Sequence, residues 1–275
     1  MPELPEVQTV VDILNTAGLS GKRIEYTAVY WPKTIATCTP EAFGQTLTGK
    51  TVSGIRRRGK YIIIGLIPEC YLIIHLRMTG RLALSDRMVK NPHVHVVLRF
   101  DDGRHLIFHD TRKFGRFYLT AAADTIIGAL GPEPLGPEFT GRYLYQQLNR
   151  RQRMIKPLLL DQTFLAGLGN IYVDEALWTA SIHPLRSSNS LSREETRSLH
   201  RAIRSVLRQG VRNSGTSLGD GKGNFVSPNN DQGRNVDQLK VFRRTGQACR
   251  RCGHAIERIV VGQRSTHICA NCQMV

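Results

Sequence analysis

An amphipathic helix is the first element that the pattern of apolar and polar positions predicts. Val7, Val10, Val11 and Leu14 recur at intervals of three and four residues, which is the spacing of one face of a helix. Gly18 follows the pattern, and glycine commonly ends a helix because it adopts conformations that other residues avoid. We therefore expect a helix that fixes the N-terminal residues against a folded body.

Between residues 22 and 120 the pattern changes to short apolar runs rich in β-branched and aromatic residues. Such runs predict strands, and the turn Asp101-Asp102-Gly103 between two of them predicts a hairpin. Strands at this density favour a sandwich or a barrel-like β domain with the first helix packed on it. The predicted strands include residues 61–66, 71–76, 94–100 and 105–108.

A proline-rich segment separates this half of the chain from a helical one. Residues 131–141 contain three prolines and no sustained period, so we interpret them as a linker and place a domain boundary there. The residues that follow, up to 212, have a helical pattern. The predicted helices are residues 155–165, 171–180 and 192–211, with a glycine-rich turn at 167–170.

Residues 214–235 predict a long loop, because they are rich in Gly, Ser, Asn and Asp. Leu218, Phe225 and Val226 are the strongly apolar positions in it. A loop of this length in a compact domain is often functional, although disorder alone would explain the composition. Both interpretations stay open on the sequence.

The net charge narrows the class of partner. Lysine and arginine number 38 against 22 aspartates and glutamates, so the formal net charge is +16 and the pI is about 10.1. A field of this sign favours an anionic polymer such as DNA or RNA. A membrane surface is the alternative, but no apolar run is long enough to span one, and the acidic start is unlike a signal peptide. We expect an intracellular protein that does not use a membrane.

Four of the six cysteines form the pattern C-x2-C-x16-C-x2-C near the end of the chain. Each close pair can hold one side of a tetrahedral ion, and the residues between the pairs have the length of a β-hairpin. Because all four ligands are protein sulfurs, the pattern predicts one structural Zn²⁺, with two disulfides or idle thiols as the alternative. Cys38 and Cys70 have no such spacing and are interpreted as ordinary small apolar residues. The predicted ligands are Cys249, Cys252, Cys269 and Cys272.

The N-terminus carries a candidate nucleophile. Removal of Met1 would leave Pro2 with a secondary amine, and an α-amino group titrates near pH ~8, far below lysine. Such an amine attacks an aldehyde-level carbon to give an iminium, which is an electron sink for breaking neighbouring bonds. Glu3 and Glu6 place two carboxylates directly behind it. The alternative is that Met-Pro is merely a permitted start and Pro5 opens a helix.

Three segments together resemble the formamidopyrimidine-DNA glycosylases, and the resemblance covers the chain from end to end. They are the start Pro2-Glu3-Leu4-Pro5-Glu6-Val7, the segment Ala166-Gly167-Leu168-Gly169-Asn170-Ile171-Tyr172-Val173-Asp174-Glu175-Ala176-Leu177-Trp178, and the four-cysteine motif. The resemblance implies a multidomain α+β fold. Its parts would be an N-terminal helix plus catalytic β-sandwich (1–130), the linker (131–141), a helix–two-turns–helix domain (142–235) with a lesion-capping loop at about 214–235, and a C-terminal β-hairpin zinc finger (236–275).

The resemblance also implies an activity, the removal of oxidised purines such as 8-oxoguanine and formamidopyrimidines from duplex DNA, followed by strand cleavage. Pro2 matches the nucleophile that attacks C1′ and forms a Schiff base, which β,δ-elimination then resolves. Glu3 matches the carboxylate that assists sugar opening and proton transfer, and Glu6 matches a further acid. Lys60 matches a lysine near the nucleophile that holds a phosphate and pairs with Glu3. Taken alone, residues 56–60 would be a solvated basic run.

Extruding a base from duplex DNA leaves a gap that protein side chains must fill. Met78, Arg112 and Phe114 match the residues that do so in the family, with Arg112 pairing to the orphaned base. Taken alone, the methionine and the phenylalanine would be interpreted as core residues. The phosphate contacts that the resemblance implies are His75, Lys156, Asn170 and Arg264, of which Lys156 and His75 could equally be solvated or buried polar residues.

The chain departs from the family pattern around the finger. Gln263-Arg264-Ser265 replaces a common Gly-Arg-Gly, and Phe242-Arg243-Arg244 replaces Tyr-Gly-Arg, so the local turns can differ. His93 and His95 are expected to share one face of a strand, but they have no third ligand nearby and do not predict a metal site.

Two other functions remain as alternatives. The sister group, the endonuclease VIII-like glycosylases, shares the nucleophile and acts on oxidised pyrimidines, but it usually has glycine where this chain has Leu4. A non-catalytic, zinc-containing protein that binds damaged DNA would need neither Pro2 nor Glu3 nor Lys60. We expect a bacterial-type protein that acts as a monomer on DNA in the cytoplasm and nucleoid.

Overall fold

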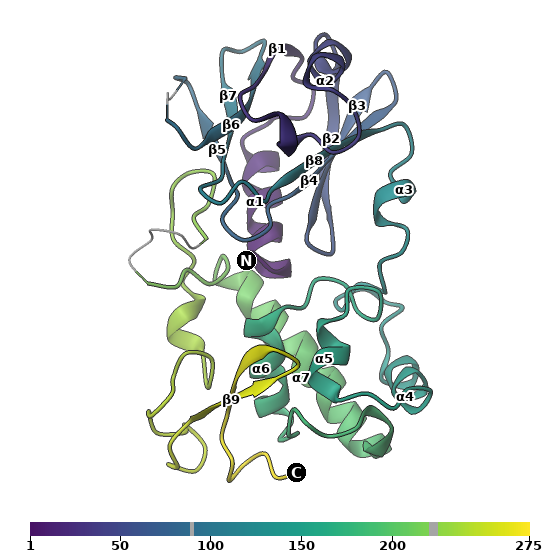
Figure 1. The fold of residues 1–275 in the computed structure, drawn as a ribbon, viewed down its shortest axis with the longest axis vertical. Coiled ribbons are helices and arrows are strands. Elements are labelled where there is room, and N and C mark those ends of the chain that lie inside the picture. Colours follow the sequence, from purple (N-terminus) through teal and green to yellow (C-terminus); the bar gives the residue numbers. More distant parts are fainter. Residues whose placement is uncertain (89–90, 220–224) are drawn as a thin grey trace. The chain divides into compact units, whose positions relative to one another are not determined.

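The computed structural model describes residues 1–88, 91–219 and 225–275, and these residues form two compact units (Figure 1). Unit 1 contains Met1–Ala129 and Asn213–Arg234. Unit 2 contains Leu130–Arg212 and Asn235–Val275. The chain therefore leaves the first unit, builds most of the second, and returns to the first for one segment.

The described part of unit 1 contains two antiparallel sheets, with strand orders β1-β6-β7-β5 and β2-β3-β4-β8. This arrangement confirms the predicted helix plus β-sandwich. The strands are β1 (Ile24–Val29), β2 (Thr51–Arg58), β3 (Tyr61–Ile67), β4 (Cys70–His75), β5 (Arg81–Ser85), β6 (Val94–Phe100), β7 (His105–His109) and β8 (Arg116–Thr120). The helices are α1 (Leu4–Thr16), α2 (Pro40–Leu47), α3 (Asp124–Ile127) and the single-turn η1 (Pro32–Thr34).

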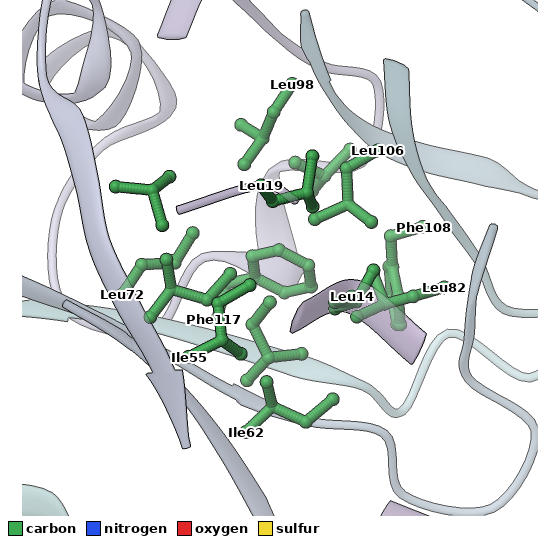
Figure 2. Packing of buried hydrophobic residues seen from close by; sticks show 14 of the residues in the cluster. Leu14, Leu19, Ile55, Ile62, Leu72, Leu82, Leu98, Leu106, Phe108 and Phe117 are labelled. Atoms are coloured by element: carbon green, nitrogen blue, oxygen red, sulfur yellow. The ribbon is translucent and has the colours of Figure 1, made fainter. Parts of the chain in front are cut away.

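One hydrophobic cluster joins α1 to both sheets, because each element turns its apolar residues toward the same interior (Figure 2). Leu14 of α1 is fully buried in the same cluster as Ile62 of β3, Leu98 of β6 and Phe117 of β8. The helix thus has a fixed position on the sandwich, as its apolar spacing predicted.

Unit 2 combines helices with a two-stranded hairpin. Its elements are α4 (Gly141–Asn149), α5 (Ile155–Leu160), α6 (Asn170–Thr179), η2 (Ser188–Ser190), α7 (Arg193–Arg212), η3 (Asn235–Gln238), β9 (Glu257–Val261) and β10 (Arg264–Ile268). Helix α5 ends five residues before the predicted end at 165. Asp161 explains the early stop, because its Oδ1 accepts hydrogen bonds from the Thr163 N–H at 3.1 Å and the Thr163 hydroxyl at 2.7 Å, and so favours a turn.

Up to Arg234, the described residues of the predicted loop at 214–235 belong to unit 1 by their contacts. We assigned it to the helical domain, but its described residues lie in unit 1, and residues 220–224 lie outside the described part. The three apolar positions that stand out in its sequence, Leu218, Phe225 and Val226, are all buried, and Phe225 joins the hydrophobic cluster of the sandwich. The pattern of residues along the chain could not reveal that this segment returns to the first unit, because its packing partners are distant in the sequence.

Candidate active site and nucleic-acid interface

The N-terminal residues are held at the start of α1. Pro2 is buried, and Glu3 is the N-cap residue of the helix and only 3% exposed. Glu6 completes a capping box, because its Oε2 accepts the Glu3 backbone N–H at 2.8 Å. Because Met1 precedes Pro2, the proline nitrogen is an amide in this chain.

Glu6 has a structural task that the sequence interpretation as a further acid missed. Its second oxygen, Oε1, accepts the backbone N–H of Thr216 at 2.7 Å. Gly215 sits against it, since a Cβ there would lie 2.9 Å from the Glu6 Cγ, and its φ of +81° also favours glycine. With both oxygens hydrogen-bonded and 1% exposure, Glu6 fastens the returning segment to the first turn of α1.

The returning segment is closed at its base by hydrogen bonds of its own. The Ser217 hydroxyl donates to the Phe225 carbonyl at 2.6 Å and accepts the Gly233 N–H at 2.8 Å. Thr216 also forms an antiparallel bridge with Arg234. The described ends of the predicted capping loop are thus anchored to the unit that carries Pro2.

Lys60 lies in the two-residue turn between β2 and β3, where Gly59 has a φ of +55°. Arg57 ties this turn to the beginning of α1, because its guanidinium donates to the Gln8 Oε1 at 2.9 Å and to the Gly59 carbonyl at 3.0 Å. Lys60 is 5% exposed, so residues 56–60 are not merely a solvated basic run.

His75 ends β4 opposite Tyr61, with the two ring centroids 4.6 Å apart. Burial, with the nearby charges of Arg77 and Lys60, lowers the pKa of His75 to about 3, so the ring is neutral at physiological pH. Its Nδ1 accepts the Arg77 N–H at 3.0 Å, which leaves the proton on Nε2. His75 is therefore a hydrogen-bond donor that does not change with pH near neutrality.

Met78 and Phe114 are large apolar residues that remain exposed, by 39% and 45%. These values exclude the interpretation of either side chain as part of the core. Arg112 is exposed as well, and its guanidinium carbon lies 4.7 Å from the centre of the Phe114 ring. The three residues lie on two short loops, one after β4 and one between β7 and β8.

The fully buried Asp110 organises both loops, and our sequence analysis did not single it out. The Thr79 hydroxyl and the Arg112 N–H both donate to its Oδ1, the latter at 3.1 Å, while the Gly115 N–H donates to its Oδ2 at 2.7 Å. One carboxylate thus joins the loop of Met78 to the loop of Arg112 and Phe114. The only signal in the sequence was its place at the start of Asp110-Thr111-Arg112-Lys113-Phe114-Gly115.

A core ring sets how closely these loops approach the sandwich. A Cβ at Gly80 would lie 2.9 Å from the Phe108 ring, and a Cβ at Gly115 would lie 2.2 Å from it. Phe108 itself belongs to the hydrophobic cluster (Figure 2). The loops are therefore supported by rigid packing beneath them.

His93 and His95 do not share a face, which corrects our expectation. His95 is 1% exposed and its Nε2 lies 2.7 Å from the Asp110 carbonyl oxygen, whereas His93 is exposed and precedes β6. An irregular register between Val94 and Val96 explains the difference.

In unit 2, Lys156 is fully buried, which corrects its predicted role as a direct phosphate contact. Its Nζ lies 2.6 Å from the Asp174 Oδ1 and also donates to the Thr266 hydroxyl at 2.8 Å and the Ser265 carbonyl at 3.1 Å. Asp174 in turn accepts the His267 N–H at 2.9 Å. This ion pair fastens β10 to α5 and α6, and a buried pair of this kind needs such further hydrogen bonds.

Asn170 and Arg264 remain available for a ligand. The Asn170 Nδ2 donates to the Ser265 carbonyl at 2.8 Å, and its Oδ1 is buried without a partner among the described residues. Arg264 is exposed at the first position of β10. The turn before it has positive φ at both Gly262 (+54°) and Gln263 (+61°), so Gln263 adopts a conformation that glycine favours.

The four motif cysteines form the cluster that zinc requires. Their sulfurs lie within 4.8 Å of one another, with 3.4 Å between Cys252 and Cys269 and 4.0 Å between Cys249 and Cys272. Zn–S bonds of about 2.3 Å in a tetrahedron put sulfurs roughly 3.8 Å apart, whereas a disulfide needs about 2.05 Å. The cluster therefore fits one structural zinc, and its S–S separations exclude the two disulfides.

Glu175 is a second residue that our sequence analysis did not assign. Its carboxylate accepts the backbone N–H groups of Lys240, Val241 and Phe242 at 2.8 to 2.9 Å. Burial raises the pKa of Glu175, while these three amides act against that shift. The residue fixes to α6 the segment that leads into the finger.

We predict that unit 1 loses stability on acidification because of His75. The unfolded histidine takes up a proton near pH 6.5 and the folded one only near pH 3, so stability falls as the pH drops below about 6.5. His75→Gln should reduce the stability difference between pH 7 and pH 5 by up to about 2 kcal/mol. Urea unfolding followed by Trp31 fluorescence in a Trp178→Phe background measures this.

His93→Gln is the matched control, because His93 is exposed. An unchanged pH dependence in His75→Gln, or an equal change in the control, contradicts the assignment.

We also predict that Cys269→Ser loses the zinc and unfolds the hairpin. The small cluster around Trp178, Val241 and Ile256 packs on the cysteines and offers little other support. Metal analysis should find about one zinc per chain in the wild type and much less in the variant. Hydrogen exchange should speed up in β9 and β10 while β3 and β4 stay protected. Cys38→Ser should retain the zinc, and a Cys269→Ser protein with full zinc would contradict the site.

No helix in the described ranges is both long and apolar enough to cross a membrane. Three family models match successive parts of the chain. They are the formamidopyrimidine-DNA glycosylase N-terminal domain at residues 1–117, the H2TH domain of the same family at 130–220, and the zinc finger found in FPG and IleRS at 246–275.

Relatives match over nearly the full length. A formamidopyrimidine-DNA glycosylase of Protochlamydia amoebophila is 47% identical, with 99% of each chain covered. One of Herpetosiphon aurantiacus is 46% identical, covering 99% of this chain and all of that one. A solved complex of a Lactococcus lactis FPG variant with Fapy-dG-containing DNA has a TM-score of 0.92 at 37% identity, and both chains are covered completely. The chain therefore belongs to the formamidopyrimidine-DNA glycosylase family.

Proposed function

We propose that this chain removes oxidised purines, including 8-oxoguanine and formamidopyrimidines, from duplex DNA and cleaves the strand at the resulting abasic site. The start of α1 carries the proposal, because Pro2 and its neighbour Glu3 are both buried there. Membership of the family supports it. A Lactococcus lactis protein of similar structure was solved with DNA that contains an abasic site, at a TM-score of 0.91.

In the proposed reaction, removal of Met1 first exposes the Pro2 amine. Its lone pair forms a bond to C1′, and the bond between C1′ and the base breaks, so the base leaves with the electron pair and takes up a proton. The amine loses its own proton, and Glu3 assists opening of the sugar as the iminium forms. Loss of a C2′ proton then expels the 3′ phosphate, and a second elimination expels the 5′ phosphate. Hydrolysis of the iminium releases the sugar fragment and restores the amine.

The proposed contacts divide between the two units. In unit 1, Lys60 and the Nε2 proton of His75 hold phosphates near the lesion. In unit 2, Asn170 and Arg264 hold the backbone, and arginine suits bidentate contact with phosphate. Lys156 contributes indirectly by keeping β10 in place. The zinc would hold the finger that presents Arg264, and it takes no part in the reaction.

The exposed side chains on the two loops above the sandwich take the place of the extruded nucleotide. Met78 and Phe114 wedge the stack, and Arg112 pairs with the orphaned base. The guanidinium of Arg112 lies against the Phe114 ring, so the two side chains would enter the DNA stack together. Glu6 keeps the lesion-capping loop at the first turn of α1.

Leu4 favours the group that acts on purine lesions, because the sister group, which acts on pyrimidine lesions, usually has glycine at this position. One observation keeps the second class in the test, since a Lactococcus lactis Fpg of similar structure was solved with DNA that contains an oxidised pyrimidine, at a TM-score of 0.91. The relatives are bacterial, and we propose the nucleoid as the place of action.

Borohydride trapping tests the nucleophile. Wild-type protein with an 8-oxoguanine·cytosine duplex should form a covalent adduct, because borohydride reduces the iminium to a stable amine. A folded Pro2→Gly variant should lose nearly all of it, and mass spectrometry should place the adduct on Pro2. A dihydrouracil duplex run in parallel separates the two lesion classes. Wild-type protein that forms no adduct with either lesion or with an abasic duplex would support the non-catalytic alternative.

A second prediction concerns the buried carboxylate below the wedge. Asp110→Asn should slow 8-oxoguanine excision by about tenfold to a hundredfold, since a hydrogen bond to a charged group contributes ~1.5–3 kcal/mol. Cleavage of a preformed abasic site in single-stranded DNA needs no wedge and should change little. A 2-aminopurine next to the lesion should report weaker insertion by a smaller rise in fluorescence.

Asp101→Asn is the control, because Asp101 is an exposed residue of the β6–β7 turn. Equal losses on the duplex and on the single strand would contradict a role for Asp110 in the wedge.

A further inference from the structure

The longest helix of the described residues carries a continuous row of arginines. In α7 they recur every three or four residues, so they occupy one face of the helix. Its apolar residues, among them Leu199, Ile203 and Leu207, are buried on the opposite face, where α7 packs against α4 and α6. We call the row the arginine ridge, and it consists of Arg193, Arg197, Arg201, Arg204, Arg208 and Arg212.

Two members of the ridge have partners inside unit 2. Arg204 donates to the carbonyl oxygens of Pro134 at 3.1 Å and Gly136 at 2.9 Å, and so holds the linker. The Arg193 guanidinium lies 5.3 Å from the centre of the Tyr145 ring. These contacts account for both residues structurally.

The other four, Arg197, Arg201, Arg208 and Arg212, are exposed. None of their guanidinium groups has an ion pair or hydrogen bond to another described residue. The helix borders a hollow of about 360 Å³. Its lining consists of four ridge arginines, Arg201, Arg204, Arg208 and Arg212, together with His200 and Ser205. Three of the four unpaired cations, Arg201, Arg208 and Arg212, thus border a space that a ligand can enter.

The exposed arginines of the ridge do not stabilise one another. Like charges four residues apart on a helix repel one another, and the pairs 197/201 and 208/212 have this spacing. The acids of α7, Glu194 and Glu195, stand in its first turn, and Glu195 is paired with Arg186. An external polyanion would remove the repulsion.

We propose that the arginine ridge binds the phosphate backbone of a nucleic-acid segment other than the one that contains the lesion. The ridge spans ~28 Å, over which one DNA strand presents a phosphate about every 3.4 Å of its axis. It does not belong to the Asn170 and Arg264 site, because α7 turns its opposite, apolar face toward α6. A membrane partner is disfavoured, since amphipathic helices bind lipid through an exposed apolar face and that of α7 is buried.

The test compares two duplexes that carry the same tetrahydrofuran abasic analogue, one of about 12 and one of about 60 base pairs, since only the longer extends beyond the lesion-binding region. Four substitutions, Arg197→Gln, Arg201→Gln, Arg208→Gln and Arg212→Gln, are combined, and affinity is measured against salt. On the long duplex the slope of log K against log salt should become less steep by roughly 3 to 4, at about 0.9 for each lost phosphate contact. On the short duplex it should not change.

Two further variants sharpen the result. Arginine-to-lysine changes at the same four positions should retain the slope, because the charge is kept. A control that changes Lys33, Arg87, Arg99 and Arg150 to Gln removes the same charge from exposed positions off the helix and should also retain it.

An unchanged slope on the long duplex, or an equal loss on the short one, overturns the proposal. It is also overturned if duplex binding is unchanged while the ridge variant loses retention on phosphatidylglycerol vesicles. The test uses an abasic analogue that needs no excision, so it stands apart from the proposed lesion chemistry.

Discussion

A carboxylate taken out of water must be given hydrogen-bond donors, because a buried charge without them costs several kcal/mol. Glu6, Asp110, Asp174 and Glu175 are all almost fully buried, and each accepts at least one backbone N–H. For three of them this N–H comes from a distant segment, whereas Asp110 accepts N–H groups of its own loop and reaches the other loop through the Thr79 hydroxyl. Loops near the candidate site are therefore fixed by these four anchors. The loops can carry exposed, reactive or apolar side chains because buried carboxylates fix their backbones through hydrogen bonds.

The pattern divides evenly between the units. In unit 1, Glu6 holds the returning segment and Asp110 holds the loops that bear Met78 and Phe114. In unit 2, the neighbouring residues Asp174 and Glu175 of α6 point to different partners, one to β10 and the other to the segment before the finger. Each unit thus has buried anchors of its own, and zinc adds a further cross-link in unit 2, where the hydrophobic cluster is small.

Much of the architecture could be predicted because it depends on local spacing. The apolar period of α1 and α7, the hairpin turn between β6 and β7 and the cysteine spacing are short-range signals. Predictions failed where a distant partner decided the outcome. Lys156 was predicted to contact a phosphate, but it is buried in an ion pair with Asp174, eighteen residues away. His93 and His95 differ because an irregular pairing with β7 separates their faces.

By itself, the sequence determined the class of fold, the family, the zinc ligands and the presence of Pro2 beside Glu3, since each of these depends on residue type and on spacing along the chain. Tertiary structure alone decided that the segment after α7 belongs with the sandwich, that Glu6 and Asp110 are anchors, and that Lys156 is buried. The physical reason is the same in each case. A side chain's task depends on which donors and acceptors lie around it, and folding brings those together from positions far apart in the sequence.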